Sequence, residues 1–420
     1  MSAFTIRAIK DDEVESYVTT MFWAAGRPVD TAFIAEQRSA FSLARAFAAF
    51  DGKELVGTIG TRSLSMTLVG GAHVPIAAIG QGGVLPTHAR KGAMRALMLR
   101  SLDAAREHEE PLAAWTTSEW PLYERYGGGP ATFSAAYRLR ALGRSTLRRP
   151  IDVQGRVRMI THDEALNIVP ELHHRAARRQ PGGVPRDLSY WERAFGRLKA
   201  GTSLDVLESR RDLPAALFCA SVDGENCYDG LCVYRVHQRF EAGLFQSEME
   251  ILYFIVASHD AEAALWSLLM GTDLVSSIFI GHAPVENPLR WLLKDGRRME
   301  TVGSQDHVWL RLLDPVAVLG SRWFTRLHLP LTVKIHDPSG APGDMTIEIH
   351  SDGVRTEVTT TSAIADVEME IGTLSSLVLN GNNVWNLAAA GRIVYASYDS
   401  LVKAAIAFAN TEPAFTDTSF

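Results

Sequence analysis

The stretch from Pro75 to Arg100 constrains the fold of this 420-residue chain more than any other. An apolar run, Ile76 to Ile79, is followed by closely spaced glycines, a basic turn at Arg90-Lys91-Gly92, and apolar residues at helical spacing. This order predicts a strand, a basic glycine turn and a helix, with Gly80, Gly82 and Gly83 marking a bulge or a close approach of another backbone or a ligand. The first turn of such a helix offers unpaired N–H groups and a positive dipole end, so it can hold a diphosphate. The alternative is an ordinary exposed start of a basic helix.

Composition narrows the class of protein. A chain of 420 residues should form two or three domains, and 46% hydrophobic with 21% charged residues is typical of globular proteins. The net charge of -6 gives no reason to expect a nucleic-acid partner. Three cysteines lack metal-ligand spacing, which favours reduced thiols and no metal. With no signal peptide and no membrane-spanning segment in view, we predict a cytoplasmic protein without a membrane partner.

The segments around this stretch predict a mixed α/β domain. The expected elements, in chain order, are a strand at Phe4–Ile9, helices from Asp11 toward Phe22 and over Phe33–Leu43, strands at Ala46–Phe50, Leu55–Ile59 and Ser63–Val69, the central strand and helix, and a buried strand at Leu112–Thr116. A short helical turn closed by glycine then follows at Leu122-Tyr-Glu-Arg-Tyr-Gly127.

Three short motifs in this order resemble the GNAT superfamily of acetyl-CoA-dependent N-acetyltransferases. They are a strand end at Val84-Leu85-Pro86, the basic turn Arg90-Lys91-Gly92, and Tyr123-Glu124-Arg125-Tyr126-Gly127. Ala89 stands where the family usually has Arg or Gln, and Met94 where it has a second glycine or alanine. Because most phosphate contacts in such a loop come from backbone N–H groups, the loop can tolerate both changes.

The middle of the chain repeats its beginning. The run from Val157 to Ala165 matches the run from Ile6 to Val14 in its Arg, Ile, Asp and Glu positions, which indicates a duplicated domain. The second copy also has a strand, Met249–Val256, leading into a helix. Its turn, however, carries Asp260 and Glu262 where the first copy has basic residues, so a diphosphate would be repelled. We therefore expect a non-catalytic copy.

From about Leu310 the pattern changes to three alternating, β-branched strands followed by three short helices, which resembles the sterol carrier protein fold. The expected strands are Leu331–Asp337, Met345–Ser351 and Val354–Thr360. The expected fold class is thus α/β (α+β). It comprises a catalytic GNAT domain at 1–145, a second, degenerate GNAT-like domain at 150–305, and a sterol-carrier-protein-like α+β domain at 310–420.

Taken as a whole, the chain is similar to the Eis-type (enhanced intracellular survival) N-acetyltransferases. The resemblance implies acetyl-CoA as cosubstrate, a small-molecule amine substrate of aminoglycoside-like or lysine-like type, no metal, and a homohexamer. It places the proton-donating group on Tyr123 and the proton acceptor on the terminal carboxylate of Phe420. It also implies acetyl-CoA contacts at Gly82, Gly83, Val84, Arg90, Lys91, Gly92, Ala93, Met94, Arg95, Ser118 and Glu119.

The chemistry of amine acetylation fits these two groups. An ammonium must lose a proton before it attacks a thioester, and the departing thiolate needs one. A phenol with a pKa of about 10 suits the second task. A terminal carboxyl, with a pKa of about 3.3 to 3.7, is a weak base unless burial raises it. Backbone N–H groups near Gly82 and Val84 are candidates for binding the developing oxyanion.

Several alternatives stay open at this point. Tyr123 can be a core residue with Tyr126 the more exposed tyrosine, and Phe420 can end a frayed tail. Where the family usually has a glutamate just before the last residue this chain has Ser419, so Asp417 and Asp30 are the candidates for that role. Two other functions remain: a non-catalytic ligand- or lipid-binding protein that retains the fold, and a protein lysine or N-terminal acetyltransferase.

Overall fold

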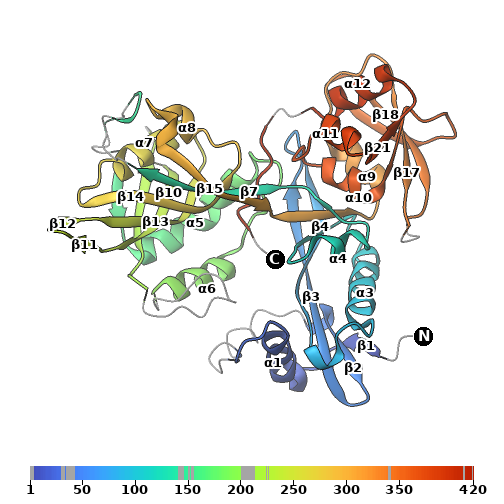
Figure 1. The fold of residues 1–420 in the computed structure, drawn as a ribbon, viewed down its shortest axis with the longest axis horizontal. Helices are drawn as coiled ribbons and strands as arrows, with labels where there is room; N and C mark the ends of the chain where they lie inside the picture. The colour runs from blue at the N-terminus through green and yellow to red at the C-terminus, as the bar shows by residue number, and fades with distance from the viewer. Residues whose placement is uncertain are drawn as a thin grey trace. The chain divides into compact units, whose positions relative to one another are not determined.

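The chain divides into two compact units in a computed structural model (Figure 1). Unit 1 comprises residues 1–132 and 306–420, and unit 2 comprises residues 133–305. The structure describes residues 4–29, 34, 43–140, 146–149, 152, 156–199, 213–223, 225, 227–338, 342–409, 412–418 and 420. The expected helix at Phe33–Leu43 lies outside the described residues except for Ile34 and Leu43.

Unit 1 contains a seven-stranded sheet in the order β1-β2-β3-β4-β5-β16-β6. Its strands are β1 (Thr5–Ala8), β2 (Ala46–Asp51), β3 (Glu54–Thr67), β4 (His73–Val84), β5 (Leu112–Thr116), β16 (Val308–Leu312) and β6 (Gly129–Pro130). The accompanying helices are α1 (Val14–Ala24), α3 (Ala93–Glu107) and α4 (Trp120–Glu124). The apolar face of α3 packs through Leu97, Met98 and Leu102 into a core lined by β2 to β5. This is the strand, turn and helix that the stretch from Pro75 predicts.

One strand is longer than the sequence predicts. Leu55–Ile59 and Ser63–Val69 were expected as separate strands, but β3 runs through both as a single 14-residue strand. Gly60 does not end β3. Thr58 pairs with Gly83 and Gly60 pairs with Gly80, so the register shifts here and the extra residue lies in the opposing strand, β4. The expected break is instead a β-bulge in β4.

Unit 2 contains a second seven-stranded sheet, in the order β15-β7-β14-β13-β10-β9-β8. Its strands are β8 (Val157–Ile160), β9 (Leu217–Val222), β10 (Tyr228–His237), β13 (Ser247–Val256), β14 (Val275–Pro284), β7 (Phe133–Arg140) and β15 (Met299–Asp306), with a hairpin of β11 (Phe240–Glu241) and β12 (Leu244–Phe245). Its helices are α5 (His162–Ala177), α6 (Leu188–Lys199), α7 (His259–Leu269) and α8 (Leu289–Leu292). In both sheets antiparallel strands lead to one parallel pair, β4 with β5 and β13 with β14. The predicted duplication is therefore visible in the topology.

The two copies differ in where their next strand comes from. Beside β5 lies β16, which follows the strands of unit 2 in the chain, whereas β7, which follows β6, lies beside β14. The last strand of each copy is thus supplied by the other copy's segment of the sequence. We propose 1–145, 150–305 and 310–420 as the bounds of the three domains in the sequence, although β7 joins the sheet of unit 2 and β16 joins that of unit 1.

The C-terminal subdomain of unit 1 (α9 to α12) has a five-stranded sheet in the order β19-β18-β17-β20-β21. Its elements are α9 (Pro315–Ser321), β17 (Leu331–His336), β18 (Met345–Ser351), β19 (Thr356–Thr360), β20 (Val367–Glu370), α10 (Ile371–Leu377), α11 (Val384–Ala389), β21 (Ile393–Tyr395) and α12 (Tyr398–Ala407). The three predicted strands and three predicted helices are present, and the sequence missed β20, β21 and α9.

This subdomain packs closely on the loop after α4. A Cβ atom on Gly129 would clash with the carbonyl oxygen of Gly372 in α10, so both backbones meet directly. Glu124 of α4 pairs with Arg392 at 2.9 Å. The C-terminal subdomain thereby contacts and stabilises α4, the short helix that carries Tyr123. In the described part of the chain, no helix combines the length and apolar character needed to cross a membrane.

Candidate functional site

Strands β4 and β5 separate in the middle of the first sheet. Their parallel pairing extends from Ile76 opposite Leu112 to Ala78 opposite Ala114, and β4 then continues alone on that side to Val84. Gln81 adopts a left-handed conformation at φ 56°, and its carbonyl accepts a hydrogen bond from Thr58 Oγ1 at 2.9 Å. A bulge at this point turns the strand away from its neighbour. Backbone groups of β4 beyond Ala78 therefore have no β5 partner among the described residues.

The turn that follows β4 exposes the N-terminus of α3. Gly92 is the N-cap at φ 93° and provides no side-chain cap, so the N–H groups of the first turn await an acceptor. Arg90, Lys91 and Arg95 are exposed and have no hydrogen-bond or ion-pair partner among the described residues. Their positive charge adds to the helix dipole, and this combination binds anions.

The predicted acetyl-CoA residues fall into two groups. Gly82, Gly83 and Val84 end β4, and residues 90 to 95 form the turn and first helical turn. The groups adjoin, since a Cβ on Gly82 would lie 3.7 Å from Met94 Cε. On the other side, Gly83 packs against α1, where an added Cβ would lie 2.6 Å from Ala24 Cβ. Ser118 and Glu119 are exposed after β5, and Glu119 is the N-cap of α4.

Tyr123 is the half-buried tyrosine of α4. Its ring lies 6.1 Å from that of Trp115 in β5. Burial raises the pKa of its phenol, and Tyr126 and Glu119 raise it further. Tyr126 is only 5% exposed, so the alternative in which it is the more exposed tyrosine is wrong. Tyr126 follows the end of α4 and belongs to the buried cluster that also contains Trp309 and Trp115.

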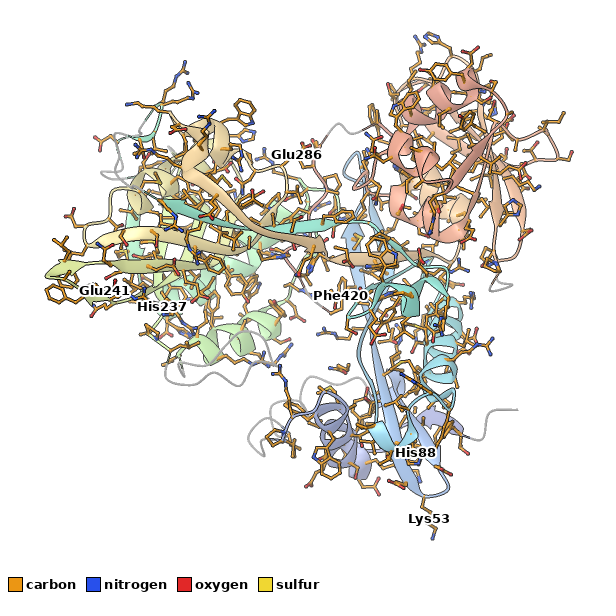
Figure 2. All side chains as sticks on the ribbon, in the orientation of Figure 1. Lys53, His88, His237, Glu241, Glu286 and Phe420 are labelled. Atoms are coloured by element: carbon orange, nitrogen blue, oxygen red, sulfur yellow. The ribbon has the colours of Figure 1, made fainter. Side chains whose placement is uncertain are left out.

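The last residue of the sequence returns to β4. A Cβ atom on Gly80 would lie 2.6 Å from the carbonyl carbon of Phe420 and 2.7 Å from its oxygen (Figure 2). Thr416 and Thr418 are buried, so this tail is packed rather than frayed. The last paired residues are Ala78 in β4 and Ala114 in β5. Gly80, which contacts Phe420, lies two positions further along β4, and Trp115, whose ring is near that of Tyr123, lies one position further along β5. Phe420 and Tyr123 therefore lie next to the two strands at the point where the strands separate. Asp417 is half-buried, and Ser419 and Asp30 lie outside the described residues.

Comparison with known proteins identifies the lineage. Models of the acetyltransferase (GNAT) domain match residues 5–131 and 182–312, and a sterol carrier protein domain model matches residues 316–416. An uncharacterized N-acetyltransferase of Streptomyces griseus is 29% identical over 398 residues, covering 92% of each chain. N-acetyltransferase Eis of Mycobacterium tuberculosis is 30% identical over 375 residues, covering 88% of this chain and 87% of the relative. The chain belongs to the Eis N-acetyltransferase family.

Solved structures of Eis-type and related proteins agree with this assignment. Eis1 from Mycobacterium abscessus superposes with a TM-score of 0.84 at 27% identity, over 99% of this chain and 100% of that one. A GCN5-related N-acetyltransferase from Anabaena variabilis shares the fold, with a TM-score of 0.80 at 16% identity over 99% and 100% of the chains. The fold class expected from the sequence, two GNAT domains and a sterol-carrier-protein-like domain, is confirmed, and the protein is an acetyltransferase. GNAT acetyltransferases take the acetyl group from acetyl-CoA.

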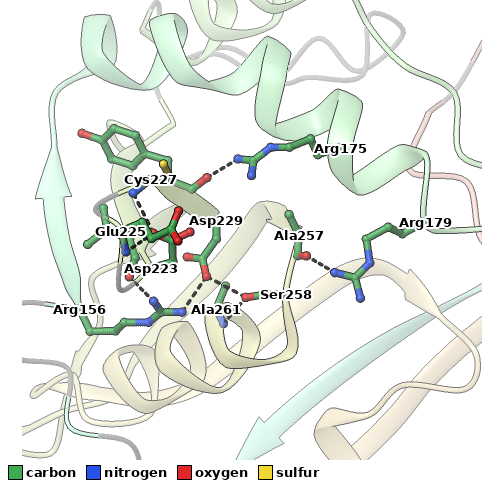
Figure 3. Close-up of polar contacts among 12 residues, drawn as sticks. Arg156, Arg175, Arg179, Asp223, Glu225, Cys227, Asp229, Ala257, Ser258 and Ala261 are labelled. Atoms are coloured by element: carbon green, nitrogen blue, oxygen red, sulfur yellow. Dashed lines mark hydrogen bonds and ion pairs between the residues drawn. The ribbon is translucent and has the colours of Figure 1, made fainter.

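In this Eis-type chain, the corresponding turn of unit 2 is filled by the protein itself (Figure 3). Ser258 caps α7 by accepting a hydrogen bond from the N–H of Ala261 at 3.0 Å, and its hydroxyl donates to Asp229 at 2.7 Å. Asp229 is 4% exposed and pairs with Arg156 at 2.7 Å. The Asp229 carboxylate thus accepts a hydrogen bond from the N-cap residue of α7, near the positive end of that helix. The signal for this contact in the sequence is Asp229 itself, an acidic residue beside the apolar run Leu231–Val233.

A further group that the sequence did not reveal supports the first sheet. Arg45 and Glu110 form a buried bidentate pair with both N–O distances at 2.7 Å, and Ser63 donates to the same carboxylate at 2.5 Å. They join the start of β2 to the loop before β5. The arginines that follow His173 in the sequence predict a solvated helix face, but this histidine is buried, with its ring 5.1 Å from that of Trp191.

Proposed function

We propose that the chain transfers an acetyl group from acetyl-CoA to a primary amine of a small cationic substrate, aminoglycoside-like or lysine-like, by direct attack. The observation that carries the proposal is the packing of the Phe420 main chain on Gly80, where β4 leaves β5. A carboxylate there attracts an ammonium group and can take its proton. Because β4 and β5 separate at the same point, we expect the acetyl group of acetyl-CoA to bind there, between Tyr123 as the acid and the Phe420 carboxylate as the base.

The cosubstrate is held mainly by main-chain donors. In this proposal the N–H groups of Gly92, Ala93, Met94 and the adjacent turn bind the diphosphate, and Arg90, Lys91 and Arg95 add charge-assisted bonds. The backbone of Gly82, Gly83 and Val84 binds along the rest of the cosubstrate and stabilises the oxyanion. Ser118 and Glu119, at the start of α4, complete the set from the β5 side. The carboxylate of Asp229 keeps unit 2 from binding a second diphosphate.

The reaction needs three proton transfers: two protons leave the nitrogen, and one reaches the thiolate. The carboxylate of Phe420 takes a proton from the ammonium, and the free amine forms a C–N bond to the thioester carbon. When the tetrahedral species collapses, the C–S bond breaks, and Tyr123 gives its phenolic proton to the thiolate. Burial supports this role, because the raised pKa of Tyr123 keeps the phenol protonated. As the amide forms, the attacking nitrogen loses its second proton, which returns to the phenolate and restores Tyr123, and the carboxyl of Phe420 releases its proton to solvent.

A thioester-release assay across a panel of amines tests the proposal. We expect turnover with small cationic amines and a loss of about 10²-fold or more in kcat for Tyr123→Phe. Tyr398→Phe is the matched control, since Tyr398 is 67% exposed on α12. Acetyl-CoA binding without turnover on any amine would favour the ligand-binding alternative. Turnover confined to lysine peptides or protein N-termini would favour a protein acetyltransferase.

Three further statements complete the proposal. It requires Phe420 to be the last residue of the native chain, which the intact mass of the protein reports. The resemblance to the Eis-type family implies a homohexamer, which sedimentation analysis measures directly. A cytoplasmic location follows from the reduced state expected for the cysteines, and fractionation of cells tests it.

A further inference from the structure

We infer that His307 is a positioning residue for the carboxylate of Phe420. Its Nε2 lies 3.2 Å from the carbonyl oxygen of Thr418, two residues before the terminal group. A carbonyl oxygen can only accept, so Nε2 carries the hydrogen and donates it. The inference rests on the proposed function, because it matters for activity only if the Phe420 carboxylate is the base.

The segment that carries His307 is itself well fixed. The N–H of His307 donates to Thr132 O at 2.9 Å, and the next N–H, of Val308, donates to Thr132 Oγ1 at 3.1 Å. Trp309 then pairs with Trp115 across β16 and β5. The imidazole therefore projects from backbone that is held by hydrogen bonds on both sides, and through Thr418 it can restrain the tail.

The same segment also contacts the start of α4. Asp306 Oδ2 accepts hydrogen bonds from Trp309 Nε1 at 2.5 Å and from Thr117 Oγ1 at 3.2 Å. The ring of Trp309 lies 5.0 Å from that of Trp120, edge to face. Residues 306 to 309 thus contact both the tail that ends in Phe420 and the helix that carries Tyr123. One short segment fixes the acid and the base relative to each other.

This geometry makes a specific kinetic prediction. Without the bond from His307, the last residues of the tail lose one restraint, and the carboxylate occupies its place beside Gly80 for a smaller fraction of time. Since misplacement of a catalytic group by about 1 Å can cost about 10²-fold, we expect kcat to fall about tenfold or more. The KM for acetyl-CoA should stay within about twofold, because α3 and its turn are untouched.

Three variants distinguish the effect of losing the hydrogen bond from the effect of losing side-chain volume. His307→Ala removes the donor, His307→Gln places an amide N–H near the position of Nε2, and His307→Asn is too short to reach. His350→Gln, in the ion pair with Glu348 on β18, is the matched control. For each, kcat, the KM of both substrates and the melting temperature are measured. The rate at which carboxypeptidase A releases phenylalanine from the tail is a second readout, independent of activity.

The inference is supported if Ala and Asn lower kcat, Gln restores most of it, and phenylalanine is released faster from the Ala variant. It is overturned if the Ala variant turns over within about twofold of the parent, or if Gln behaves like Ala. A chain extended beyond Phe420 distinguishes failure of the proposed function from failure of the inference about His307 alone. If the extension leaves kcat unchanged, the proposed function fails; if it lowers kcat while His307→Ala does not, the inference alone fails.

Discussion

The carbonyl carbon of Phe420 lies 2.6 Å from the point where a Cβ atom of residue 80 would be, so Gly80 is the residue that lets the tail reach β4. Real Cβ atoms do not come so close to backbone carbon, and any larger residue must displace the tail or the strand. In the sequence, Gly80 is only one of three glycines that interrupt an apolar run. The prediction that these glycines mark a bulge or a close backbone approach is confirmed at Gly80, which lies at the bulge of β4 and next to the tail.

Gly80→Ala is therefore predicted to lower kcat by about 10²-fold, in line with the loss of a general base. The acetyl-CoA KM should change little, because the turn at Arg90 to Gly92 is not altered. Gly320→Ala is the control, since an added Cβ there meets nothing within 4 Å. Steady-state kinetics of the two purified variants decide the matter. Equal activity in both would mean that the tail is not needed beside Gly80.

Lys91→Ala should weaken acetyl-CoA without slowing chemistry. A charge-assisted bond to phosphate is worth about 1.5–3 kcal/mol, so the KM should rise by roughly tenfold or more while kcat at saturation stays near that of the parent. Lys53→Ala, an exposed lysine at the turn between β2 and β3, should leave the KM unchanged (Figure 2). Rising salt should narrow the difference between Lys91→Ala and the parent. A drop in kcat at unchanged KM would argue against a phosphate contact.

The pH profile tests the role of Tyr123. Burial raises the pKa of its phenol above the usual value, so the acid form persists as pH rises and is lost only above about pH 10. We expect kcat, measured with saturating amine, to show no alkaline decline below about pH 9.5. A decline with a midpoint between pH 7 and 9 would assign the proton donor to a different group.

Glu110→Ala should strongly destabilise the protein. It leaves the buried guanidinium of Arg45 without its carboxylate, a change that costs about 3–5 kcal/mol. Glu107→Ala removes an exposed partner of Arg100 and should cost about 0.5 kcal/mol. Urea unfolding of both variants gives the comparison. Similar midpoints for the two variants would show that the buried pair contributes little to stability.

The sequence predicted those features that depend on local pattern. Periodicity and turn residues located β4, the basic turn and α3, and the two carboxylates at Asp260 and Glu262 marked unit 2 as different. These signals are short-range, because a strand, a cap or a turn is determined by neighbours in the chain. The continuity of β3 was not predicted, because the β-bulge at this point lies in the opposing strand, β4, and not at Gly60 of β3 itself.

Features that depend on contacts between distant residues could not be predicted. Nothing local to Asp229 shows that it meets Ser258 and Arg156, and nothing near His307 shows that it meets Thr418. The exchange of β7 and β16 between the two sheets is of the same kind, because the pairing partner of a strand lies far away in the chain. The catalytic assignment of Phe420 rests on the resemblance to a family, and only the structure shows that Phe420 contacts Gly80.

The central claim is that the carboxylate of Phe420 is the general base, and adding residues beyond it tests this most directly. An extension of two glycines keeps every side chain but converts the carboxylate into an amide. We predict that kcat falls by at least about 10²-fold, with an unchanged KM for acetyl-CoA and an unchanged melting temperature. An extended chain that acetylates its best amine at the parental rate would contradict the account.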